Sequence, residues 1–167
     1  ILNRFAQQQD HLYLFSHPPG GENVKAKAVV ANPLYLVAPP GHWASRQRSL
    51  SFSMLQEERF ILREPGSATR MTFDSWLSSQ ATEIKYSMQM ESNEAIRLSV
   101  MAGLGVALLS AHTLQGQQHR LSVLEVSGFP LLSHWYLVRH SNKRLPQAAV
   151  KLGSFIEQQL ALWQDPL

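Results

Sequence analysis

The chain has 167 residues, 44% hydrophobic and 16% charged, which is enough to bury a core and form one domain or two small lobes. It has no cysteine, so disulfides, thiolate metal sites and cysteine nucleophiles are excluded and a cytoplasmic location is favoured. The net charge is +3 with the basic residues scattered along the chain, which argues against a nucleic-acid surface, and neither a signal peptide nor a membrane-spanning run is present.

Hydrophobic periodicity and turn residues predict the first half of the chain as short elements. Residues 1–8 have the pattern of an amphipathic helix, and a buried strand over 12–15 ends at Ser16-His17-Pro18-Pro19-Gly20-Gly21. Further strands are expected at 26–31, 34–38 and 59–62, and Ser51 is expected to cap a short helix over 52–57.

The second half alternates helix and strand. Helices are predicted at 69–80, 93–103 and 110–116, and strands at 84–90, 105–109 and 121–126. This alternation indicates βαβ units and a mainly parallel sheet. A strand over 134–138 and a helix from Pro146 complete the chain, with five apolar side chains of that helix expected to face inward: Ala149, Leu152, Phe155, Ile156 and Leu160.

The turn between the strand at 59–62 and the helix at 69–80 predicts an anion site. Gly66 permits a tight turn, Ser67 and Thr69 offer hydroxyl groups, and Arg70 adds a positive charge. The first amide groups of a helix have no intrahelical partner and carry the positive end of the helix dipole. A purely capping role for Ser67 is the competing interpretation.

A second helix start and one loop add candidate ligand-binding residues. Ser92 and Asn93 begin a helix at the carboxyl end of a strand, where open α/β sheets bind ligands, although capping alone also explains them. Ser16 and His17 follow the first strand, and His17 is either a ligand contact or a loop histidine with no such role. Gly103-Leu104-Gly105 follows a predicted helix, so it indicates a helix C-cap and not a dinucleotide loop.

The sequence offers no catalytic or metal site. The seven histidines are dispersed, and no pair has the spacing that places two imidazoles on one helical face. Glu57 and Glu58 are adjacent, so they point in different directions and are assigned to a solvated face. No nucleophile elbow, P-loop or zinc-protease motif is present, and we therefore expect no enzyme activity and no cofactor.

Two segments resemble the sensory domain of LysR-type transcriptional regulators. Residues 60–70 are similar to the family's strand–loop–helix motif, which has glycine where this chain has Ala68, and residues 92–110 resemble its helix–turn–strand. Four shorter stretches resemble regulators of carbon dioxide fixation operons: 10–19, 32–34, 128–130 and 134–136. His11 departs from that subgroup, which usually has an acidic residue there.

The resemblance implies an α/β fold of two Rossmann-like lobes joined by crossover strands, like a type 2 periplasmic binding protein. Lobe one would comprise residues 1–33 and 135–167, lacking its first strands, and lobe two residues 34–134. The winged helix-turn-helix would lie outside this chain, so promoter DNA would be bound only through that missing domain.

The resemblance also implies that a small anionic metabolite, phosphorylated or carboxylated, is the effector. The protein would act as a homo-dimer or tetramer in the cytoplasm, without a membrane partner. Two alternatives remain: a periplasmic-type solute-binding protein for a small anion, and an anion-using enzyme such as a prephenate-dehydratase-like protein. The first would need an export signal, and the second a convergent acid and base.

Overall fold

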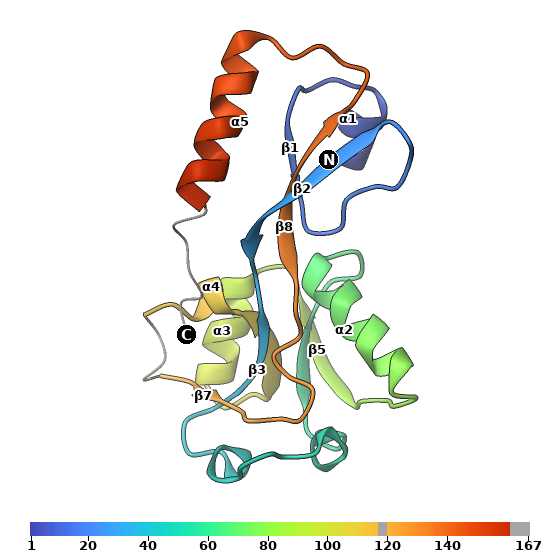
Figure 1. Ribbon diagram of the computed structural model, residues 1–167. Helices are drawn as coiled ribbons and strands as arrows, with labels where there is room; N and C mark the ends of the chain where they lie inside the picture. The colour runs from blue at the N-terminus through green and yellow to red at the C-terminus, as the bar shows by residue number, and fades with distance from the viewer. Residues whose placement is uncertain (117–119, 161–167) are drawn as a thin grey trace. The chain divides into compact units, whose positions relative to one another are not determined.

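The computed structural model describes residues 1–116 and 120–160, of which 86 and 87 are described by their backbone alone (Figure 1). The internal contacts divide the chain into two compact units. Unit 1 comprises residues 1–32 and the described residues from 133 onward, and unit 2 comprises residues 33–132. The expected lobe boundaries lie within two residues of this division, although residues 161–167 of the expected lobe one are outside the described part.

Unit 2 is built on a five-stranded sheet in the order β5-β4-β6-β3-β7. The strands are β3 (Leu34–Ala38), β4 (Phe60–Arg63), β5 (Tyr86–Met90), β6 (Val106–Ser110) and β7 (Ser122–Val123). Its helices are η1 (Trp43–Arg46), η2 (Phe52–Leu55), α2 (Ala68–Ser79), α3 (Asn93–Met101) and α4 (Ala111–Leu114). Strand β4 is parallel to both β5 and β6, whereas β3 is antiparallel to both of its neighbours.

The sheet of unit 2 is covered on both faces. Alternate side chains of each strand point to opposite sides, so β3, β4 and β6 each contribute to both hydrophobic clusters. On one face, Phe73 and Leu77 of α2 pack in a cluster with strand residues such as Phe60. On the other, Ile96 and Val100 of α3 pack in a second cluster. Figure 1 shows α2 and α3 on opposite sides of the sheet. The connection from β4 runs to β5 on one side of β4, and the next connection runs to β6 on its other side. The strand order therefore reverses between β4 and β6, and such a switch point leaves a crevice at the carboxyl ends of the strands.

Unit 1 has an antiparallel sheet in the order β1-β8-β2, formed by β1 (Tyr13–Phe15), β2 (Val24–Ala31) and β8 (His134–His140). One face packs against α1 (Leu2–Ala6), where Phe5 stacks on His140 at 4.0 Å between ring centroids. The other face is covered by α5 (Gln147–Leu160), whose Gly153 lies over Leu12. None of the described helices is long and apolar enough to cross a membrane.

Three local predictions were wrong. Ser51 does not cap η2, because its hydroxyl is shared with Ser53 at 2.9 Å. The strand expected at 121–126 is reduced to Ser122–Val123. The mainly parallel sheet is mixed in unit 2 and entirely antiparallel in unit 1, since β3 and β8 pair with their neighbours in the opposite direction.

The buried face of α5 was also predicted wrongly in part. Leu152 and Phe155 are 52% and 59% exposed, whereas Gly153 is buried. Ala149, Ile156 and Leu160 are half-buried. Glycine allows the helix to approach the sheet closely, so the contact stripe runs through Gly153 and turns Leu152 and Phe155 outward. The predicted C-cap is confirmed, because Gly103 follows α3 with φ +83°.

Candidate functional site

The turn that follows β4 places a helix start at the carboxyl edge of the sheet. Gly66 has φ +88°, a conformation that glycine adopts without strain. The Ser67 amide donates to the carbonyl of Glu64 at 3.2 Å, and the Ser67 hydroxyl accepts from the amide of Arg70 at 3.1 Å. Ser67 is therefore the N-cap of α2, as the capping interpretation predicted.

Capping leaves other donors at this helix start unused. Within the described part of the chain, the amides of Ala68 and Thr69 have no hydrogen-bond acceptor. The Ser67 hydroxyl uses a lone pair in the cap, so its hydrogen stays available to a ligand. Thr69 lines a small recess at the end of β4 together with Ile61, Leu62, Arg63, Arg70, Phe73 and Leu108. The capping and anion-binding interpretations are thus compatible.

The second predicted helix start lies beside the first, and Arg63 connects them. Ser92 caps α3 by accepting from the amide of Ala95 at 3.3 Å. The Arg63 guanidinium, at the end of β4, donates through Nη1 to Oδ1 of Asn93 at 2.6 Å. The structure thus brings Gly66, Ser67 and Thr69 to the same edge as Ser92 and Asn93, at the carboxyl ends of the parallel strands β4 and β5.

Arg63 was missed by the sequence analysis. It lies within the segment 60–70 that resembles the family motif, and a charged residue that ends a buried strand was the available signal. Its guanidinium also donates to both carboxylate oxygens of Glu64, at 2.8 and 2.9 Å. This hydrogen bonding holds the pKa of Glu64 below its ordinary value, against the opposing effect of burial.

The charged groups around the two helix starts neutralise one another. The Arg70 Nε lies 2.9 Å from both oxygens of Asp74, and its Nη1 donates to the carbonyl of Arg63 at 3.1 Å. At α3, Glu94 pairs with Arg97, whose hydrogen bond lowers the pKa of the Glu94 carboxyl. Attraction for an anion therefore depends on amides, hydroxyls and helix dipoles more than on unpaired charge.

The remaining predicted site residues lie in unit 1. Ser16 and His17 form the bend after β1, where Ser16 is half-buried and His17 is exposed. Among the described residues, no group of three or more histidine, aspartate or glutamate side chains could hold a metal ion.

Comparison with known proteins identifies the family to which the chain is similar. The family model "LysR substrate binding domain" matches residues 1–161. The "RuBisCO operon transcriptional regulator" of Allochromatium vinosum is 40% identical over 152 residues, 90% of this chain and 50% of that protein. The "HTH-type transcriptional activator CmpR" of Synechocystis sp. is 36% identical over 147 residues, 87% of this chain and 48% of that protein. The chain thus spans about half the length of these curated relatives.

A similar solved structure contains a ligand. The CcmR regulatory domain of Synechocystis PCC6803, in complex with 2-PG, superposes with a TM-score of 0.88 at 26% identity, over 96% of this chain and 78% of that one.

Proposed function

The chain belongs to the LysR substrate-binding domain family, and from this premise we propose that its unit 2 binds a small phosphorylated carboxylate where α2 and α3 begin. The family resemblance is confirmed, as is the subgroup, since the matched relatives include regulators of RuBisCO operons. The expected fold, a two-lobed α/β domain like a type 2 periplasmic binding protein, is the fold of this family. The same matches favour the regulator over a periplasmic solute carrier.

The observation that carries the proposal is the joining of two helix starts by Arg63 at the carboxyl ends of β4 and β5. The amides of Ala68 and Thr69, with the hydroxyls of Ser67 and Thr69, offer hydrogen bonds to phosphate oxygens. Ser92 and Asn93 then offer donors to the carboxylate, and 2-phosphoglycolate is the first compound to test because the CcmR domain was solved with 2-PG. Ser16 and His17 are proposed as further ligand contacts from unit 1.

The wider biological role is part of the same proposal. The two units would act as the lobes of an effector domain, and the ligand would shift their equilibrium only by as much as its affinity differs between the two arrangements. The full-length protein would control a carbon-fixation operon from the cytoplasm, as a homo-dimer or tetramer that holds promoter DNA through a domain outside this chain. The chain would need no cofactor and would catalyse no reaction.

The proposal is tested by calorimetry with 2-phosphoglycolate on the chain and its variants. Thr69→Ala removes a hydroxyl at the helix start and should weaken binding about tenfold, because hydrogen bonds to charged groups contribute about 1.5–3 kcal/mol. Arg70→Ala should have a smaller effect, since Asp74 already holds that guanidinium. Ser78→Ala, in the exposed last turn of α2, is the control. Unchanged affinity in both Thr69→Ala and Arg70→Ala would refute the assignment.

A further inference from the structure

Unit 1 carries a net positive charge, whereas the charges of unit 2 balance. Residues 1–32 and 133–160 contain seven lysines and arginines against three aspartates and glutamates. Residues 33–132 contain eight of each. The excess charge of the chain therefore lies in the unit that does not contain the α2 and α3 helix starts.

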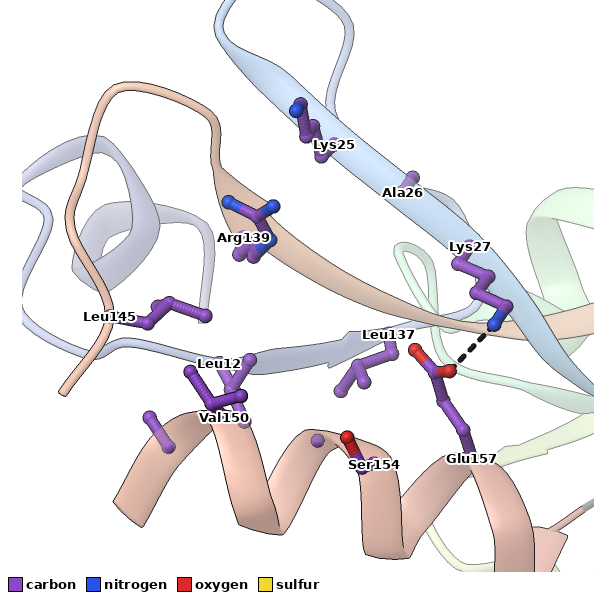
Figure 2. A pocket seen from close by; sticks show the side chains of 12 residues that line it. Leu12, Lys25, Ala26, Lys27, Leu137, Arg139, Leu145, Val150, Ser154 and Glu157 are labelled. Carbon is purple, nitrogen blue, oxygen red and sulfur yellow. Dashed lines mark hydrogen bonds and ion pairs between the residues drawn. The ribbon is translucent and has the colours of Figure 1, made fainter. Parts of the chain in front are cut away.

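A pocket of about 400 Å³ lies in unit 1 between α5 and the sheet (Figure 2). Pockets that bind small molecules have volumes of roughly 300–1,000 Å³. Its apolar lining includes Leu12, Leu137, Leu145 and Val150. A Cβ at Gly153 would lie 3.7 Å from Leu12 Cδ1 and 3.8 Å from Leu137 Cδ2, so the missing side chain helps to keep this floor open.

Three cations line the same pocket: Lys25, Lys27 and Arg139. Lys27 is paired with Glu157 of α5 at 2.6 Å, and Figure 2 shows this pair at one end of the pocket. Within the described part of the chain, Lys25 and Arg139 have no acidic partner. The Arg139 Nη1 donates only a long hydrogen bond, 3.3 Å, to the carbonyl of His140.

Lys25 and Arg139 are placed directly opposite each other across the β2–β8 pair. Directly opposed like charges destabilise an antiparallel pair of strands. A bound anion between them would remove this repulsion, and the apolar floor beside them would exclude water from the rest of the ligand.

We propose that this pocket is a second ligand site, which binds a small organic anion with an apolar body. The anionic group lies between Lys25 and Arg139, and the apolar group lies on Leu12, Leu137 and Val150. The site is formed within unit 1 and is separate from the proposed phosphate site of unit 2, so two chemically different compounds can bind the same domain.

Phenylacetate is a suitable probe, with its neutral analogue phenylacetamide as the matched ligand control. By calorimetry on the 167-residue chain, phenylacetate should bind at least about tenfold more tightly than phenylacetamide, because only the former makes charge-assisted hydrogen bonds. Lys25→Gln and Arg139→Gln should remove this preference. Lys151→Gln, an equal charge change on the exposed side of α5, should not.

Three further measurements test the site, and the NMR measurement on the unmodified chain does not depend on the folding of any variant. Without probe, Lys25→Gln should raise the thermal midpoint slightly, because the opposed charges are relieved. Proton NMR should show nuclear Overhauser effects between the phenyl ring of the bound probe and the methyl groups of Leu12, Leu137 and Val150. Thr69→Ala should leave phenylacetate binding unchanged, which separates this site from that of unit 2. Equal binding of the acid and the amide, no saturable binding, or contacts elsewhere would overturn the proposal.

Discussion

Replacing Arg63 with alanine tests the contact that joins the two helix starts. The side chain of Arg63 is 18% exposed and that of its partner Glu64 is 27% exposed, so the pair is only partly screened by water. Arg63→Ala removes the bidentate pair with Glu64 and the 2.6 Å hydrogen bond to Asn93. It also leaves the Glu64 carboxylate and the Asn93 amide oxygen without this donor.

We expect Arg63→Ala to lower the free energy of unfolding by about 2 kcal/mol. A partly exposed ion pair contributes up to about 1 kcal/mol, and a charge-assisted hydrogen bond to the half-buried Asn93 contributes about 1.5 kcal/mol. Urea unfolding followed by circular dichroism measures the change, and Arg48→Ala, at an exposed loop position, is the control. A loss below about 0.5 kcal/mol, the usual range for surface substitutions, would show that Arg63 does not connect the helix starts.

Three other predictions concern the fold, its pH dependence and DNA. Gly105→Ala would place a Cβ 2.2 Å from the carbonyl oxygen of Arg59 and should cost about 2–3 kcal/mol; Gly20→Ala, with nothing within 4 Å, should be neutral by the same urea assay. Hydrogen bonds from arginine side chains lower the pKa of the carboxyls of Asp10, Glu64 and Glu94. The stability that these pairs confer is therefore present above the ordinary carboxyl pKa of about 4, and it is lost as the pH falls through the lowered pKa values. A thermal midpoint that rises as the pH is lowered below about 4 would contradict the claim that these arginine–carboxylate pairs stabilise the fold. Finally, these 167 residues should not retain a promoter fragment specifically in a gel shift at physiological salt, and sequence-specific retention would disprove that.

The elements around the candidate site were predictable from the sequence because their signals are local. Gly66 and Ser67 mark a strand-to-helix turn, and Ser92 marks a helix start, so both N-caps were expected where the structure has them. The alternation of strands and helices from residue 59 also predicted β4, α2, β5, α3 and β6 in order. Proximity of the two helix starts follows from that topology, because the carboxyl ends of adjacent parallel strands meet at one edge.

Features that depend on tertiary packing were not predictable. The pattern of α5 contains more apolar positions than one contact stripe can bury, and only the sheet beneath it shows that Gly153 is in contact while Leu152 and Phe155 are not. The hydrogen bond from Arg63 to Asn93 joins residues 30 positions apart, beyond the reach of a local motif. The antiparallel direction of β3 likewise depends on pairing with distant strands.

The most direct test of the central claim is an amide NMR titration of the chain with 2-phosphoglycolate, compared with glycolate. If unit 2 binds the phosphate at its two helix starts, the largest shifts with 2-phosphoglycolate should be those of the Ala68 and Thr69 amides, followed by Asn93, because these donors face the ligand at the ends of β4 and β5. Glycolate should leave Ala68 and Thr69 nearly unchanged. Shifts that avoid both helix starts, or equal shifts with the two compounds, would contradict the account.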